Sequence, residues 1–235
     1  MFVLEEPNKE RLLIHLHGFA SSVRSNKVNL LRELSLSTGA FSFFAMDMDY
    51  HTTTTTRVLS LLEALIVGFS KRYNHIVLSG SSHGAYVVLN FLRYREFPRN
   101  LKAAILLSPS YSTLALIIKE YGEEYCKVWL EGKEDLYIKE CDTGMELAIN
   151  REFAVDIIQR GYEIIKGQEV DFPQKPPVKL YVVHGTEDKV VPVEHSRLFT
   201  KRVESVYIEV EDDHRLDATF QRLLKEGFFE GSFLG

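Results

Sequence analysis

The fold of this chain is decided by the segment His75-Ile76-Val77-Leu78-Ser79-Gly80-Ser81-Ser82-His83-Gly84. A short apolar run is followed at once by the pattern G-x-S-x-G, in which glycines flank a serine. This order predicts a buried strand, a sharp turn and a helix, with the serine hydroxyl raised from the turn. The glycines let the strand and the helix approach each other closely. We therefore expect Ser82 at the carboxyl end of a central strand.

Strand-like and helix-like segments alternate along most of the chain. Apolar runs of strand length are separated by segments in which apolar residues recur at helical spacing. This alternation predicts an α/β fold with a mainly parallel central sheet and helices on both of its faces. After a short edge strand at 2–5, the expected strands are 11–17, 41–47, 75–79, 101–107, 178–184 and 206–210. The expected helices are 26–38, 57–73, 82–96, 193–203 and 215–229.

Residues 110–177 interrupt the alternation. We expect helices at 111–121 and 152–166, a hairpin whose strands are 135–141 and 145–149, and a proline-rich return at 172–177. The segment is too long for a simple connection and too short for a confident second domain. The sequence therefore predicts one domain over residues 1–235, with 110–177 as a small insertion, or cap, over the active site. The threonine run 52–56 is interpreted as a loop that caps the next helix.

Composition excludes several classes of partner. The 235 residues carry a net charge of −5, which leaves no basic field for nucleic acid or an anionic membrane. No apolar run approaches the roughly 18 residues of a membrane span, and the N-terminus lacks the pattern of a signal peptide. Cys126 and Cys141 lack metal-ligand spacing; two thiols in a reducing compartment are favoured, with a disulfide as the alternative. We expect a cytoplasmic protein that binds no metal.

Two polar residues that could activate a serine follow later strands. A serine is a poor nucleophile until a base stands beside it, and that base needs an orienting acid. Asp188 lies in the loop after the strand expected at 178–184, and His214 lies just after the strand expected at 206–210. We expect Ser82 as nucleophile, Asp188 as orienting acid and His214 as base. The alternatives are a helix-capping serine, a solvated histidine, and a different acid: Asp212, Asp213 or Asp217.

The segment His17-Gly18-Phe19 directly follows the first long strand. Acyl transfer develops negative charge on the carbonyl oxygen, and fixed backbone N–H groups stabilise that charge. We expect the amides of Phe19 and His83 to be the two donors. The ring of His17 is expected to hold this loop by structural hydrogen bonding. The ring of His83 is expected to diverge from Ser82 and to take no part in catalysis.

Together these motifs resemble the α/β-hydrolase family over nearly the whole chain. H-G-F, G-x-S-x-G, H-G-x-x-D-x-x-V-P and D-H occur in that family's order, and the third of them, at 184–192, is the most specific. The resemblance implies the triad Ser82, Asp188 and His214, a covalent acyl-serine and no cofactor. It also implies hydrolysis of an ester or a related acyl bond, of which we expect a carboxylic ester. The mixed charge and modest hydrophobicity of the insertion favour a small to medium soluble substrate. The stretch 17–27 is similar to small single-domain bacterial esterases and thioesterases.

Other functions stay open at this point. A thioesterase or an acyltransferase would use the same triad, and a binding protein of this fold would normally have lost one of its members. The turn 47–52 lacks the glycines found in many relatives, so the adjacent pocket wall cannot be transferred from them. Aromatic residues of the insertion either pack in its core or line an acyl pocket: Tyr121, Tyr125, Trp129 and Tyr137. The sequence leaves the oligomeric state undetermined.

Overall fold

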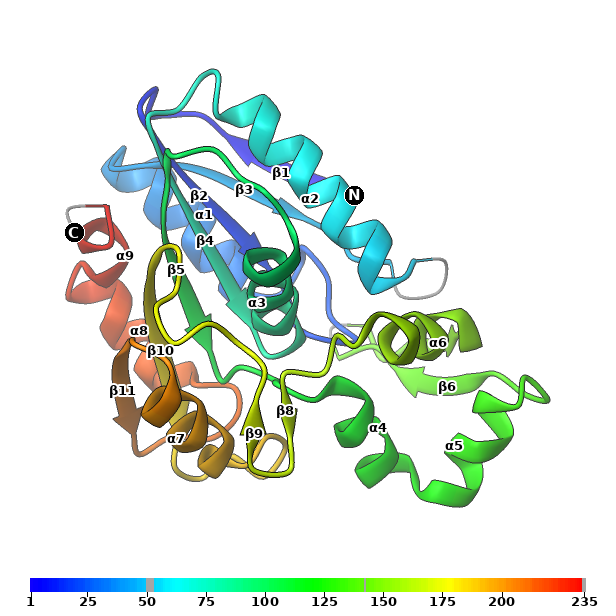
Figure 1. The fold of residues 1–235 in the computed structure, drawn as a ribbon. Coiled ribbons are helices and arrows are strands. Elements are labelled where there is room, and N and C mark those ends of the chain that lie inside the picture. The colour runs from blue at the N-terminus through cyan, green and yellow to red at the C-terminus, as the bar shows by residue number, and fades with distance from the viewer. Residues whose placement is uncertain (50–52, 142, 234–235) are drawn as a thin grey trace.

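The computed structural model describes residues 1–49, 53–141 and 143–233. At its centre, seven strands form one sheet in the order β1-β3-β2-β4-β5-β10-β11 (Figure 1). β1 is antiparallel to its neighbour β3, and the other neighbouring strands are parallel. The strands are β1 (Phe2–Glu5), β2 (Arg11–Leu16), β3 (Ser42–Met46), β4 (His75–Ser81), β5 (Leu101–Leu107), β10 (Lys179–Gly185) and β11 (Val206–Val210).

Helices cover both faces of this sheet, as the sequence predicts. Alternate residues of a strand point to opposite faces, so Leu12 and Leu13 enter two different cores. The first core is closed by α2 (Thr55–Phe69), α3 (His83–Tyr94) and α7 (Val193–Arg202). The second is closed by α1 (Asn26–Thr38), α8 (Asp217–Lys225) and α9 (Phe228–Gly231). The continuous apolar character of the central strands follows from this double burial.

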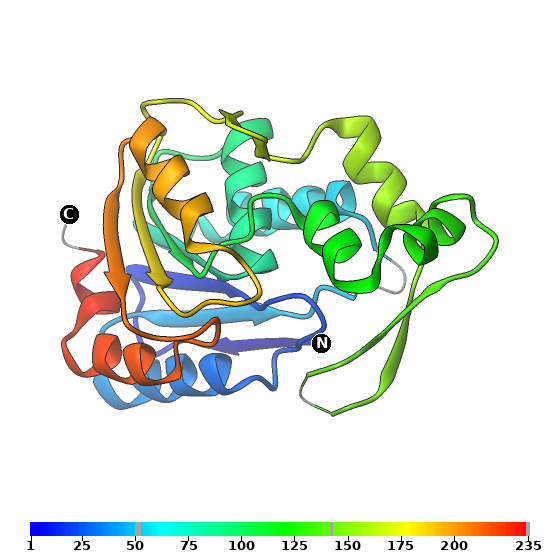
Figure 2. The same cartoon turned by 90° about the horizontal axis from the view of Figure 1, so that it is seen from below.

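The insertion, residues 110–177, leaves the sheet after β5 and returns to it at β10. Figures 1 and 2 show its helices beside the sheet, beyond the end at which β5 finishes. Trp129 is fully buried there, and its indole N–H donates to the carbonyl of Ile149 at 2.8 Å. The elements are α4 (Thr113–Tyr121), α5 (Glu123–Leu130), β6 (Leu136–Lys139), β7 (Glu146–Ile149), α6 (Arg151–Arg160), β8 (Ile165–Lys166) and β9 (Glu169–Val170).

Most of the expected elements are present, and the hairpin of the insertion is confirmed by the antiparallel pairing of β6 with β7. Residues 50–52 end the turn expected at 47–52, residue 52 also begins the threonine run, and residue 142 lies in the expected hairpin turn. These four residues are outside the described part of the chain. Thr54 caps α2, because its hydroxyl accepts the N–H of Arg57 at 3.3 Å. Capping by a threonine of this run is therefore confirmed.

Two of these predictions of helices were wrong in their extent, and one further helix was not predicted. The helix expected at 152–166 ends at Arg160, since Gly161 adopts a left-handed conformation with φ 67°. α5 was not expected as a separate helix, and Gly122, with φ 87°, divides it from α4. The closing helix expected at 215–229 is two helices, which Gly227 separates with φ 69°. In each case a glycine permits a backbone angle that ends the helix, and apolar periodicity does not register it.

Within the described ranges, no helix has both the length and the apolar character needed to cross a membrane.

Candidate active site

Ser82 occupies the strained turn between β4 and α3. Its φ of 52° and ψ of −115° lie outside the regions that L-residues ordinarily adopt. A Cβ added at Gly84 would lie 2.1 Å from the carbonyl oxygen of Leu16, and one added at Gly80 would lie 2.4 Å from the amide of Ala85. Because both clashes are with backbone atoms, only glycine fits at these two positions. The G-x-S-x-G pattern is therefore a steric requirement of this turn.

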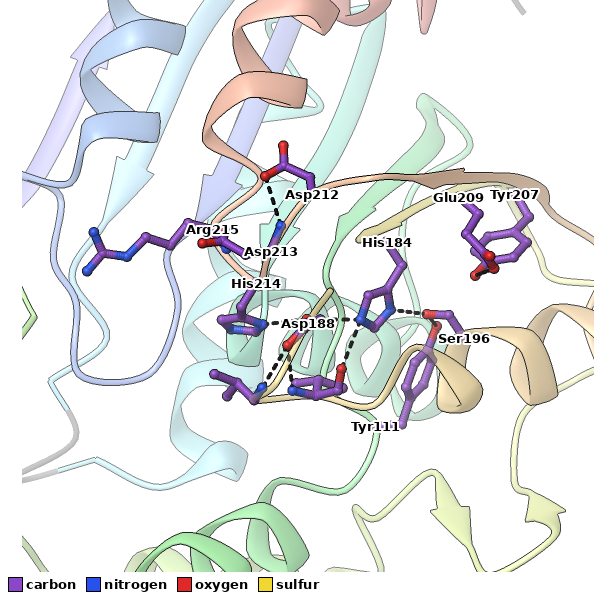
Figure 3. Close-up of polar contacts among 12 residues, drawn as sticks. Tyr111, His184, Asp188, Ser196, Tyr207, Glu209, Asp212, Asp213, His214 and Arg215 are labelled. Carbon is purple, nitrogen blue, oxygen red and sulfur yellow. Dashed lines mark hydrogen bonds and ion pairs between the residues drawn. The ribbon is translucent and has the colours of Figure 1, made fainter. Parts of the chain in front are cut away.

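Asp188 lies in the loop after β10, and its side chain is fully buried. Its Oδ1 accepts the amides of Val190 at 2.9 Å and Val191 at 2.8 Å. Its Oδ2 accepts the Nδ1–H of His214 at 2.7 Å and a second donor, Nε2 of His184, at 3.0 Å (Figure 3). Burial acts to raise the pKa of Asp188, but the hydrogen bonds from His184 and His214 outweigh it and hold the pKa well below its usual value.

Of the four carboxylates considered from sequence, Asp188 is the one that is hydrogen-bonded to His214. Asp212 instead accepts the amide of Thr219 at 2.8 Å, at the start of α8, and the amide of Asp213 at 2.8 Å. Asp213 accepts the amide of Arg215 at 2.8 Å. These two carboxylates therefore shape the loop around His214 and leave its ring to Asp188.

Ser82 and His214 line the same cavity, which has a volume of about 390 Å³. A cavity of this size suits a small organic molecule. Both residues are described, and no hydrogen bond joins the Ser82 hydroxyl to the His214 ring. Hydrogen bonds between catalytic groups are often long before the substrate binds. The cavity lining is mixed: beside the apolar Phe19, Leu107 and Leu216 it includes the polar or charged residues Ser21, Ser25, Asn26, Lys27, Arg215 and Asp217.

The loop after β2 lies against the turn that carries Ser82. A Cβ at Gly18 would lie 3.5 Å from the Cβ of Ser82, and both Gly18 and Phe19 line the cavity. The amide of Met48 donates to His17 Nε2 at 3.0 Å, so the proton of this buried ring is on Nδ1, which donates to the carbonyl of Gly18 at 2.8 Å. Since a trans peptide sets C=O and N–H in opposite directions, this bond aims the Phe19 N–H away from the His17 ring.

The ring of His83 packs instead of facing Ser82. Its Nδ1 is 3.0 Å from the hydroxyl of Thr113, and its ring centroid lies 5.6 Å from that of Phe19 and 5.7 Å from that of Phe153. Burial lowers the pKa of His83 to about 3, so the ring is neutral. Its backbone amide begins α3, directly after Ser82.

Sequence reasoning missed two residues of this region. His184 was assigned no role from the sequence, yet its Nε2 hydrogen-bonds to Asp188; the signal for it is its place as the first residue of the H-G-x-x-D-x-x-V-P motif at 184–192. Cys141, on the hairpin of the insertion, lines the cavity, and no sequence pattern indicates this. No disulfide joins Cys126 and Cys141. Among the described residues, no group of three or more His, Cys, Asp or Glu side chains is arranged to hold a metal ion.

No curated protein matches the chain. Several solved structures share its fold, all at low sequence identity. A protein from Agrobacterium vitis S4, to which a hydrolase activity is attributed, is 17% identical over 97% of this chain and 92% of its own, with a TM-score of 0.77. Alpha/beta hydrolase domain-containing protein 10 from mouse is 16% identical over 100% and 94%, with a TM-score of 0.69. Est1E from Butyrivibrio proteoclasticus is 23% identical over 100% and 94%, with a TM-score of 0.68.

The fold is therefore the α/β-hydrolase fold that the motifs predict. A family model matches residues 12–226, from β2 to the end of α8. The chain belongs to the uncharacterised protein family UPF0227.

Proposed function

We propose that this protein is a serine hydrolase that cleaves a carboxylic ester of a small to medium soluble substrate through an acyl-serine intermediate. One observation carries the proposal: a buried, ionised Asp188 holds His214 at the wall of the cavity that Ser82 also lines. A histidine oriented by a carboxylate is the arrangement that activates a serine nucleophile.

In the proposed reaction, the Ser82 hydroxyl attacks the substrate carbonyl while Nε2 of His214 takes its proton. The Nδ1–H of His214 stays bonded to Asp188, which stabilises the imidazolium. The amides of Phe19 and His83 bind the oxygen that becomes negatively charged, with a contribution of about 3 kcal/mol for each donor. His214 then protonates the leaving group. Water then attacks the acyl-serine, with His214 again as base, and this step releases the carboxylic acid and restores Ser82.

The choice of an ester is supported by structural neighbours whose names state such an activity. They include a monoacylglycerol lipase from Paleococcus ferrophilus and the esterase domain of a protein from Rhodothermus marinus. Est1E has also been solved with ferulic acid, a carboxylic acid, bound to it. These neighbours share the fold with this chain, and they favour an ester as the first substrate class to test.

Residues 110–177 are proposed to form a cap within a single domain of residues 1–235. Cys141 of the β6–β7 hairpin lines the cavity, which supports a role of the insertion in shaping the substrate site. Trp129 is buried in the insertion, whereas Tyr137 is half exposed; neither lines the cavity. Polar and charged residues in the cavity lining, Lys27 and Asp217 among them, support a substrate that has a polar part. A cytoplasmic location and the absence of a cofactor stay predictions from sequence.

The test is hydrolysis of p-nitrophenyl esters from acetyl to palmitoyl, with acyl thioesters in parallel. We expect turnover that peaks at short chains and falls by about 10⁴-fold or more in Ser82→Ala. A fluorophosphonate should label Ser82, because labelling needs an activated serine and not only a pocket. Faster thioester cleavage would favour a thioesterase, and acyl transfer to an added acceptor a transferase. If the protein shows neither turnover nor labelling, a binding protein is the remaining candidate.

A further inference from the structure

A chain of buried hydrogen bonds continues from the catalytic pair into the protein. Behind Asp188, Nε2 of His184 lies 3.0 Å from Oδ2 of the acid, and Nδ1 of the same ring lies 2.6 Å from the hydroxyl of Ser196. That hydroxyl lies 2.9 Å from the phenol oxygen of Tyr111. The side chains of Tyr111, Ser196 and His184 are fully buried. Figure 3 shows His214, Asp188, His184 and Ser196 in one row, with Tyr111 beside Ser196.

The partners determine where each proton of this chain lies. Nε2 of His184 also lies 3.1 Å from the carbonyl of Val191, which can only accept, so Nε2 carries a proton and donates. Burial raises the pKa of Tyr111 well above its usual value, so the phenol keeps its proton and can donate to Ser196. Ser196 then donates to Nδ1 of His184, and every proton of the chain has an acceptor. All donors point from Tyr111 toward Asp188.

Two charged side chains near this chain of hydrogen bonds, Glu209 and Arg215, have no hydrogen bond to it. Glu209 lies on the neighbouring strand β11, but its carboxylate accepts from Arg197 at 2.7 and 2.9 Å and from the phenol of Tyr207 at 2.7 Å. The side chain of Arg215 extends away from Asp188 in Figure 3. His184 is therefore the second side-chain donor to Asp188, beside His214.

Tyr111 connects this chain to the insertion. Its carbonyl accepts the amides of Ile164 at 2.8 Å and Ile165 at 3.3 Å, so the segment that leaves β5 and the segment that returns are joined at this residue. Its phenol is the first donor of the chain that ends at Asp188. One hydrogen-bonded path therefore connects the carboxylate of Asp188 to the place where the insertion joins the rest of the protein.

We infer that His184 is a positioning residue: its Nε2–H holds Oδ2 of Asp188 toward His214, and Ser196 and Tyr111 hold His184 in the tautomer that can do so. The inference rests on the proposed function, because it assigns a role behind the same triad. His184 lies behind the acid and does not line the cavity, so it acts through Asp188 and not on the substrate.

The test compares His184→Phe and His184→Gln, with rates normalised to the Ser82 that a fluorophosphonate titrates. Loss of the donor in His184→Phe should lower kcat by about 10- to 100-fold, since a hydrogen bond to a charged group is lost. KM should change by less than about twofold. The glutamine amide can donate from nearly the same place, so His184→Gln should recover most of kcat. Ser196→Ala keeps the imidazole of His184 and removes only the hydroxyl that donates to its Nδ1. We expect this variant to lose less kcat than His184→Phe.

His195→Gln is the matched control. His195 precedes Ser196 in the chain, and among the described residues its Nδ1 has no hydrogen-bond partner, so this variant should keep kcat. A readout that needs no turnover is the proton NMR signal of the His214 Nδ1–H, which should move in His184→Phe and return in His184→Gln. If His184→Phe keeps kcat within twofold and this signal does not move, the positioning role is wrong. If wild-type protein neither hydrolyses esters nor reacts with the fluorophosphonate, the proposed function fails, and the NMR signal still decides the role of His184.

Discussion

Cys141 donates its backbone N–H to the carbonyl of Ala20 at 2.7 Å. The contact ties the β6–β7 hairpin of the insertion to the loop that follows β2 and carries Phe19. A second tie lies at the start of α2, where the carboxylate of Asp156 accepts the amide of Thr56 at 2.8 Å and its hydroxyl at 2.6 Å. The insertion is therefore bound to the rest of the protein at two further places, and not only where it leaves and rejoins the sheet.

Modification of Cys141 tests this arrangement. The residue is exposed and lines the cavity, so attachment of a bulky maleimide should lower ester hydrolysis by about tenfold or more. Cys126 is buried, and burial raises the pKa of its thiol, so it should react slowly. Mass spectrometry would locate the adduct, and Cys141→Ser should keep its rate under the same treatment. Full activity after complete modification of Cys141 would show that the hairpin does not border the substrate.

Relief of the strained turn gives a stability prediction. Ser82 has φ 52°, which costs an L-residue about 1 kcal/mol or more but suits glycine. Ser82→Gly and Ser82→Ala should both be inactive, and the glycine variant should unfold with a free energy about 1 kcal/mol higher than the alanine variant. Urea denaturation measures the difference. Equal stabilities would mean that the surrounding contacts, and not the backbone angle, dominate at this position.

The two glycines Gly84 and Gly68 should respond in opposite ways to alanine. A Cβ at Gly84 would lie 2.1 Å from a backbone oxygen of β2, so Gly84→Ala should lower the free energy of unfolding by about 3 kcal/mol or more. Gly68 is an exposed residue of α2, and no described atom would lie within 4 Å of an added Cβ. Gly68→Ala should raise stability by about 0.5–1 kcal/mol. A neutral Gly84→Ala in thermal unfolding would contradict the close approach of α3 and β2.

Glu163 should make stability depend on pH. Burial raises its pKa to about 7, although hydrogen bonds such as that from the amide of Leu114 at 2.7 Å act to lower it. Between about pH 4.5 and 7 the folded protein keeps a proton that the unfolded chain releases, so stability falls as pH rises through this range. Glu163→Gln keeps an acceptor for Leu114 and cannot ionise. At pH 8 it should be more stable than wild type by about 2 kcal/mol, and nearly equal at pH 4.

Parallel urea titrations of the two proteins from pH 4 to 8 give the slopes directly. Identical slopes for wild type and Glu163→Gln would show that Glu163 ionises in the folded protein near its usual pH. Glu163 does not line the cavity that contains Ser82, so the rate of ester hydrolysis per labelled serine should be similar in both proteins.

The central architecture of this protein can be predicted from its amino-acid sequence. Apolar runs buried on both faces, and a turn in which only glycine fits beside Ser82, are local properties of consecutive residues. They predict the seven strands and the nucleophile elbow without knowledge of the remaining fold. The helix boundaries at Gly161 and Gly227 were not predicted, because each depends on a backbone angle that apolar periodicity does not encode.

Which groups meet at the carboxyl edge of the sheet depends on how distant segments pack. Sequence spacing left Asp188, Asp212, Asp213 and Asp217 as candidate partners of His214, and the fold selects Asp188 because the loops after β10 and β11 converge there. The role of His184 depends on Ser196 and Tyr111, which packing brings to the buried side of its ring. A hydrogen bond depends on separations of about 3 Å between atoms from distant segments, and such contacts follow from packing and not from the order of residues in the chain.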